Sequence, residues 1–277
     1  MIKLASLKRS IRQINAIVEK QIRLEMRIKP YLVMRYINPV IQLILFLFIF
    51  GLIFNIKENY SIGYWNKQNY VLFILLGYNV QFSKSILYKY QQYFNTEKYW
   101  KTLSALMVAP VNRFTLLIGI MISEFVMICI PLSILFIIMY IIYPISLFYL
   151  FLVFIIFILI FLIFGSLGLI IGVFIISHEE YVPYSMLALR IVFLFSCTNF
   201  PLYMFPEFFI PFILLNPFYY IFDLLRLVWY LGIDYNLAIT YITPFHIINI
   251  VVVTIFLLLT SMILFERVYK KYGITGY

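Results

Sequence analysis

The sequence predicts an all-α membrane protein with six transmembrane helices, and its composition and its long apolar segments carry that prediction. Of its 277 residues, 65% are hydrophobic and only 12% are charged, whereas a soluble globular protein has about 25% charged residues. The mean hydropathy is +1.01. About 20 consecutive apolar residues suffice to cross a bilayer, and several segments of the chain reach that length. An ordinary soluble enzyme is therefore excluded.

Residues 1–37 are predicted to form an amphipathic cytoplasmic helix at the membrane interface. The apolar residues recur every three or four positions, which places them on one stripe of a helix: Leu4, Leu7, Ile11, Ile14, Val18, Ile22 and Met26. Another side is basic and contains Lys8, Arg9, Arg12, Lys20, Arg23 and Arg27. Such a helix can lie on the membrane with its cations near anionic lipid. A cytosolic helix packed on a partner subunit is the alternative, and the two are compatible.

Six segments are predicted to span the membrane. They cover residues 38–56, 70–90, 113–142, 145–176, 181–198 and 240–265. Pro144 separates the third from the fourth, because proline disfavours helix in the residue before it. Cys129 and Cys197 both lie inside predicted spans, so no disulfide is expected. Six crossings place both termini on the same side.

The distribution of Lys and Arg predicts that this side is the cytoplasm. Residues 1–38 contain nine basic residues, residues 89–113 contain four and the tail 266–277 contains three. The opposite side has only Lys57, Lys67 and Arg226. Because cytoplasmic loops carry the excess of Lys and Arg, we expect a multi-pass protein of the plasma or inner membrane. Orientation also accounts for the net charge of +10, so no nucleic-acid partner is expected.

A short cytoplasmic helix is predicted at residues 96–108, between the second and third spans. Asn95 and Thr96 can cap its start, Glu97 suits the positive end of the helix dipole, and Pro110 lies beyond its end. One face is apolar and is expected to contact membrane helices: Tyr99, Trp100, Leu103, Leu106 and Met107. The other face, with Glu97 and Lys101 at favourable i, i+4 spacing, is expected to meet something polar.

Residues 199–239 are predicted to form an extracellular re-entrant helical hairpin. The segment is apolar but is interrupted by Pro201, Pro206, Pro211 and Pro217. Asn216 and Pro217 are typical of a helix start, and the apolar residues then continue to about residue 231. A helix of ~15 residues is only ~22 Å long, which is shorter than the ~30 Å hydrocarbon core. The hairpin is therefore expected to dip into the outer leaflet, where Asp223 and Arg226 can neutralise each other.

These segments, in this order, resemble the permease subunits of type-2 ATP-binding-cassette exporters over essentially the whole chain. The N-terminal helix looks like that family's interfacial connecting helix. In that family a coupling helix docks on a separate ATPase subunit. The motif similar to this helix and to the start of the next span contains Glu97, Trp100, Lys101, Thr102, Leu103, Leu106, Pro110, Arg113 and Gly119. The motif similar to its re-entrant hairpin contains Pro201, Pro206, Asn216, Pro217, Asp223 and Arg226. Many relatives have glycine where this chain has Lys101.

The resemblance implies that this chain forms the substrate pathway and that a separate ATPase drives it. None of its ten glycines opens a G-x-x-x-x-G-K phosphate loop, so ATP and Mg are expected on the partner and no cofactor, metal or catalytic residue is expected here. A two-fold pathway requires two six-span chains. The expected assembly is a permease homodimer with two ATPase subunits, surrounded by lipid. Polysaccharide, lipid, drug and peptide exporters all occur in this family, and no residue selects among them.

Two ionisable residues lie inside predicted spans, where such residues are functional candidates. Glu124 and Arg190 are ~16 and ~14 Å from the cytoplasmic ends of their spans at 1.5 Å per residue. Our hypothesis is a buried ion pair that joins the third and fifth spans. The alternative is that each faces a wet cavity or extends separately to the interface. His246 is interpreted as a packing residue with no nearby partner.

Gly165, Gly168 and Gly172 lie in the fourth span, the last two at G-x-x-x-G spacing. Glycine at this spacing permits close approach of two helices. We expect packing within the chain in preference to a dimer seam.

Two other classes of function compete with the permease. A membrane-embedded enzyme, such as an acyl or glycosyl transferase, would need convergent carboxylates or a His–Asp pair near an interface, and the sequence shows none. An ATP-independent channel or secondary transporter is the other class. The scarcity of acidic residues in the spans and the lack of repeated halves count against it.

Overall fold

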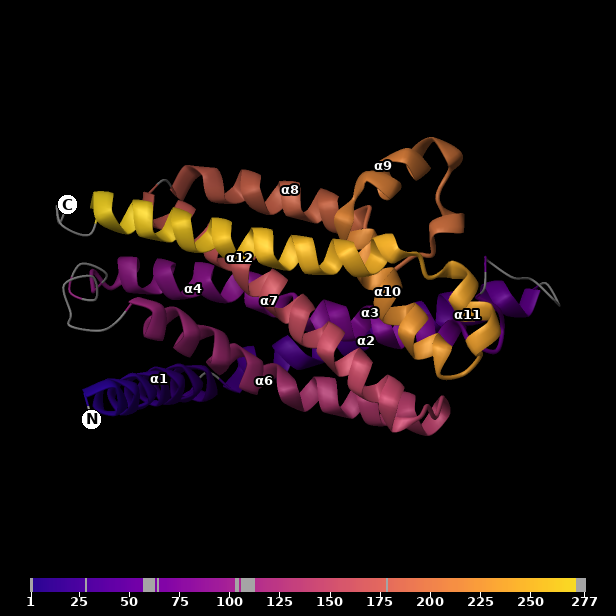
Figure 1. Ribbon diagram of the computed structural model, residues 1–277, viewed down its shortest axis with the longest axis horizontal. Helices are drawn as coiled ribbons and strands as arrows, with labels where there is room; N and C mark the ends of the chain where they lie inside the picture. The colour runs from indigo at the N-terminus through magenta and orange to yellow at the C-terminus, as the bar shows by residue number, and fades with distance from the viewer. Residues whose placement is uncertain are drawn as a thin grey trace.

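The computed structural model describes residues 2–27, 29–56, 63, 65–102, 105, 113–177 and 179–272. Most of its helices run along one long axis (Figure 1). They are α1 (Ile2–Arg27), α2 (Lys29–Ile56), α3 (Tyr70–Ser83), α4 (Ser85–Tyr99), α6 (Arg113–Ile142), α7 (Leu147–Ser177), α8 (Val182–Leu194), α9 (Ile210–Leu215), α10 (Pro217–Leu231), α11 (Tyr235–Tyr241) and α12 (Pro244–Tyr272). Short 3₁₀ helices cover Glu179–Tyr181, Leu202–Met204 and Glu207–Phe209.

Among the described residues, five helical segments are long and apolar enough to cross a membrane. They are Leu32–Asn55, Tyr70–Tyr99, Phe114–Ile142, Leu147–Ile175 and Pro244–Val268. The fifth predicted span contains α8, whose 13 residues reach only ~20 Å. The segments Glu207–Leu215 and Pro217–Leu231 meet at 90°. This sharply bent pair is either a broken sixth span or a re-entrant hairpin, and it lies where the hairpin is predicted.

The start of α1 and the end of α12 lie at the same end of the bundle (Figure 1). The end of α4, the start of α6 and the end of α7 lie there as well. An even number of crossings produces this arrangement. We refer to this end as the basic end, because it contains the three Lys- and Arg-rich segments, and to the other as the far end.

The second span, made of α3 and α4, is the buried centre of the bundle. Within Tyr70–Tyr99, 72% of the most apolar window is buried, against 11% to 39% in the other four segments. The outer helices therefore expose apolar side chains, as helices that face lipid do. At Lys84, between α3 and α4, φ is −63° and ψ is −16°, which is 3₁₀-like geometry.

Helix α7 packs closely on α4 through glycine. A Cβ atom on Gly168 would lie 2.7 Å from the backbone oxygen of Ile86 and 3.0 Å from the Cα of Leu87. A Cβ atom on Gly172 would lie 2.9 Å from the ring of Phe94. These neighbours belong to the same chain, so the prediction that these glycines pack within the monomer is confirmed.

Helix α1 packs against the bundle with a different face from the predicted apolar stripe. A Cβ atom on Gly119 of α6 would lie 2.8 Å from Cγ2 of Ile17, and Gln21 is buried. Ile11 and Met26, which belong to the stripe, are exposed. At 100° per residue, the bundle-facing side, the apolar stripe and the basic side are three adjacent faces. Ile14, Val18 and Ile22 of the stripe are half-buried, so only part of the stripe is left available to the membrane interface.

We predict that Gly168→Ala destabilises the protein relative to Gly165→Ala. Both changes gain the same helix propensity. At Gly168 the new methyl meets rigid backbone, whereas at Gly165 it meets the flexible Sδ of Met121 at 3.0 Å. Overpacking at the first site should cost about 1–3 kcal/mol, measured as a lower Tm of the purified protein in detergent. Equal melting temperatures for the two variants would contradict the packing described above.

Candidate functional site

Helix α4 continues through the position where the coupling helix was expected to start. Asn95 and Thr96 lie inside α4, which ends at Tyr99, so the predicted cap at these two residues is wrong. The physical reason is burial, since Tyr93 and Glu97 are both buried and extend the packed face of α4 by another turn. Lys101, with φ of 57°, then turns the chain out of the helix.

The predicted coupling helix lies largely outside the described residues. Of its expected contacts, Leu103, Leu106 and Met107 lie outside them, as does Pro110. Arg113 begins α6. The existence of a helix between Thr102 and Arg113 therefore stays a prediction.

Glu97 is the polar anchor at the end of α4. Its side chain is only 7% exposed, and its Oε1 lies 2.8 Å from Nζ of Lys20 in α1. Thr102 donates to its other oxygen at 2.5 Å. The expected faces are reversed here: Glu97 is buried, whereas Tyr99 and Trp100 are 83% and 52% exposed. The chain that leaves α4 is thereby fastened to α1.

Four charged side chains form a second contact between helices, which we call the ion cluster: Glu25, Arg35, Lys89 and Glu124. Arg35 Nη1 lies 2.7 Å from Glu25 Oε2, and its Nη2 pairs with Glu124 Oε1. Lys89 pairs with Glu25 and lies 3.7 Å from Glu124 Oε2. Ser85 donates to Glu124 at 2.5 Å. Two acids and two bases from α1, α2, α4 and α6 thus balance one another, and each side chain is at most 16% exposed.

The expected pair between Glu124 and Arg190 is wrong. Glu124 is 1% exposed and is bonded to Arg35, while Arg190 is exposed on α8. Equal depth in the membrane did not identify the partner, because it says nothing about which way each helix turns. Arg35 lies in the N-terminal interfacial segment 1–37 and Lys89 at the cytoplasmic end of the second predicted span, so a search restricted to charges deep inside the spans misses both.

The start of α10 at the far end is as predicted. Asn216 accepts a hydrogen bond from the backbone N–H of Phe218 at 3.0 Å and so caps the helix, with Pro217 in the first turn. The amide of Asn216 also donates to the carbonyl of Val192 at 2.6 Å. Pro201 and Pro206 each precede a 3₁₀ helix.

The two charged residues of α10 have partners from other segments. Arg226 is buried and donates to the carbonyls of Cys197 and Thr198 at 2.8 and 2.6 Å. Asp223 Oδ2 lies 3.4 Å from Nε2 of His246. The interpretation of His246 as a residue with no partner is therefore wrong. Arg226 thus fastens α10 to the segment that follows α8, and Asp223 fastens α10 to α12.

Cavities lie between the helices of the described part of the chain. A cavity of about 410 Å³ between α1 and α4 is lined by residues that include Glu25, Lys89, Glu97 and Trp100. A second, of about 320 Å³, lies among α2, α3, α4 and α6 and is lined by residues that include Arg35, Asn38, Gln42, Gln81, Lys84 and Glu124. The third, of about 330 Å³, lies between α6 and α7.

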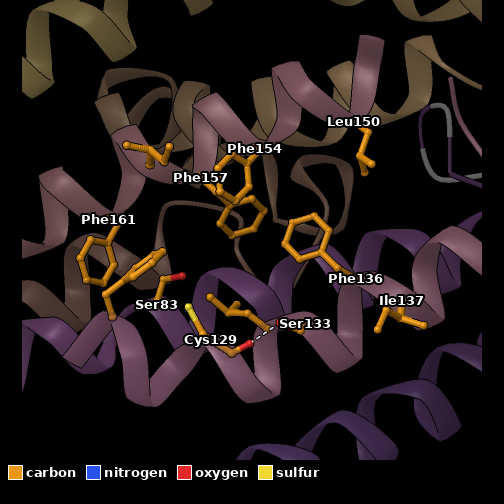
Figure 2. Close-up of a pocket in the computed structure, with 12 residues that line it drawn as sticks. Ser83, Cys129, Ser133, Phe136, Ile137, Leu150, Phe154, Phe157 and Phe161 are labelled. Carbon is orange, nitrogen blue, oxygen red and sulfur yellow. Dashed lines mark hydrogen bonds between the residues drawn. The ribbon is translucent and has the colours of Figure 1, made fainter. Parts of the chain in front are cut away.

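The third cavity is apolar (Figure 2). Aromatic rings from both helices point into it, among them Phe136, Phe157 and Phe161. Its polar residues are Ser83 and Ser133, and the hydroxyl of Ser133 is already bonded to the carbonyl of Cys129 at 2.5 Å. No charged side chain from the described residues lines it. It can accommodate an acyl chain, but its described lining has no charged side chain that could bind a charged group.

Comparison with known proteins agrees with this architecture. Residues 12–230 match the family described as ABC-2 type transporter. No curated protein matches the chain.

We predict that a double-mutant cycle couples Glu124 to Arg35 and not to Arg190. Glu124→Ala removes one of the two acids of the ion cluster, so that Arg35 and Lys89 share Glu25 alone, and it should lower stability by about 3–5 kcal/mol. In the Arg35→Ala background the same change should cost markedly less. In the Arg190→Ala background its cost should be unchanged. Chemical or thermal unfolding of the purified protein gives these values, and additivity of Glu124 with Arg35 would contradict the ion cluster.

Proposed function

The chain belongs to the ABC-2 type transporter family, and on that premise we propose that it is the permease subunit of an exporter driven by a separate ATPase. Membership makes it a membrane component of an ABC transporter. The direction of transport, the partner and the assembly of two permeases with two ATPases are parts of the proposal. ATP and Mg would bind to the partner.

The observation that supports coupling to a partner is the pair of polar anchors at the basic end. Lys20 holds the end of α4 through Glu97. The ion cluster joins the same α4 to α1, α2 and α6. Each anchor connects segments that are far apart in the sequence. A force applied just beyond α4 would therefore move α1 and α4 as one unit.

Helix α4 provides a route from that end to the middle of the bundle. It continues α3 through Lys84, and the two form the most buried span. We propose that closure of the ATPase subunits pushes on residues 96–108 and that α4 transmits the displacement to α3. The surrounding spans then tilt and switch the pathway between inward and outward access. The exposed rings of Tyr99 and Trp100 are available for contact with the partner.

We predict that Glu97→Ala uncouples the transporter. The end of α4 then loses its charge-assisted contact with the half-exposed Lys20. If that contact transmits the force and contributes about 1.5 kcal/mol, stimulation of the partner ATPase in the co-purified complex should fall about tenfold. The reversed pair, Lys20→Glu with Glu97→Lys, should recover part of it. Glu19→Gln is the matched control, because Glu19 pairs with Arg23 on the exposed side of α1 and should have no effect.

Two outcomes would contradict the proposal. If the chain purifies without an ATPase and moves its substrate in proteoliposomes without ATP, it is not an ATP-driven permease. If ATPase stimulation in the complex is the same for wild type, Glu97→Ala and Glu19→Gln, the anchor at Glu97 does not couple the subunits.

We also predict the sidedness of two exposed lysines. In a background of Cys129→Ala and Cys197→Ala, Lys101→Cys should react with a membrane-impermeant maleimide only from the cytoplasmic side. Lys67→Cys should react only from the outside. Reaction of the cysteine at position 101 from outside would place the proposed docking segment on the wrong side of the membrane.

A further inference from the structure

The cavity among α2, α3, α4 and α6 is polar although it lies within the spans. Asn38 and Gln42 of α2 line one side, and Gln81, Lys84 and Ser85 line another. Its volume of about 320 Å³ corresponds to about ten water molecules. Polar side chains inside a span are costly unless they line a wet or ligand-bearing space.

Lys84 differs from the other charged residues of this cavity, because no ion pair accounts for its position inside a span. It lies at the middle of the span Tyr70–Tyr99, where a cation is most costly. Its Nζ contacts Gln81 Oε1 at 3.1 Å and lies 4.5 Å from the centroid of the Phe193 ring. Within the described part of the chain, no carboxylate lies within 4.0 Å of it.

Arg35 of the ion cluster provides a comparison with Lys84, because it is a cation in the same region that has carboxylate partners. Arg35, on the wall of the same cavity, meets both Glu25 and Glu124. The acid on this wall, Glu124, is therefore already neutralised by Arg35. No carboxylate of the described residues neutralises Lys84 in this way, so an anion that enters the cavity could pair with it.

The surface next to the cavity is apolar. On α2, Ile41, Ile44 and Leu45 lie beside Gln42 in sequence and are exposed. A molecule with its charged group in the cavity could place a hydrocarbon chain along this surface. A small hydrophilic anion has no hydrocarbon part that could contact this surface.

We infer that this cavity binds the anionic headgroup of an amphiphile, with Lys84 recognising the charge and Gln42 and Gln81 donating hydrogen bonds. The inference rests on the proposed function, since it assigns the class of substrate that the permease moves: a membrane amphiphile with a phosphate or carboxylate group. Lys84 is a binding residue in this assignment.

Binding of matched fluorescent lipids to the full chain tests the inference without the ATPase. The probes are phosphatidylglycerol and phosphatidylcholine that carry the same labelled acyl chain, and the protein is held in neutral detergent. Wild type should prefer phosphatidylglycerol. Lys84→Gln should weaken that lipid about tenfold, the effect of losing one charged hydrogen bond, and should leave phosphatidylcholine unchanged.

Three further variants distinguish binding in this cavity from a general attraction of anionic lipid to a basic protein. Lys84→Arg should stay within about threefold of wild type, because the charge is kept. Arg190→Gln removes an exposed cation of α8 and should change nothing. Gln42→Leu should reduce the preference without altering charge. An unchanged preference in Lys84→Gln, or an equal loss in Arg190→Gln, overturns the inference.

A competition experiment tests whether the cavity binds the headgroup of an amphiphile or free phosphate. Inorganic phosphate should fail to displace labelled phosphatidylglycerol at matched ionic strength, and displacement would overturn the amphiphile assignment. A wild-type chain with no preference between the two lipids also overturns it. The dependence of partner ATPase on Glu97 is measured separately, so either proposal can fail while the other stands.

Discussion

The need to neutralise buried charge at the basic end determines how the helices of this protein can move. Removing an ion from water into a low-dielectric interior costs several kcal/mol, and a close partner repays that cost only at good geometry. Glu25, Arg35, Lys89 and Glu124 come from four helices. If one of these helices moves alone, it leaves a charge unpaired. Movement of α1, α2, α4 and α6 together at this point is much less costly.

This constraint gives the N-terminal helix a role in holding the bundle together. Its bundle-facing side supplies Lys20 to Glu97 and Glu25 to the ion cluster. Ile11 and Met26 of its apolar stripe, on an adjacent face, are exposed. One helix thus joins the end of α4 to α2 and α6 while it lies at the edge of the bundle. If a partner ATPase drives this chain, as proposed, such a helix would distribute the applied force over several spans.

The sequence was informative where a feature depends on local chemistry. Asn216 and Pro217 start a helix wherever they occur together with an apolar segment, and glycines at G-x-x-x-G spacing allow close packing in any bundle. Hydropathy located the long spans for the same reason. The partners of Glu124, Asp223 and His246 could not be found in this way. Each pair joins helices whose rotation about their axes depends on the packing of the whole chain, which spacing along one helix does not encode. The predicted helix start at residue 96 was wrong for the same reason. Contacts with α1 extend α4 past the capping residues Asn95 and Thr96, which are a local signal.

Lys84 combines two features, since it is the junction between two helices and part of the wall of the polar cavity. It is the 3₁₀-like junction between α3 and α4, and such irregularities inside long helices often mark hinges. It also lines the polar cavity, next to the wall that contains Arg35 and Glu124. A displacement transmitted along α4 reaches Lys84 before it reaches α3. Any change of angle at this junction therefore moves Lys84 relative to α2, and under the inferred binding role this would alter the affinity for an anion in the cavity. In the proposed mechanism, coupling between the two processes would require no contact between ATPase and substrate, because Lys84 is both the junction of the two helices and part of the wall of the cavity.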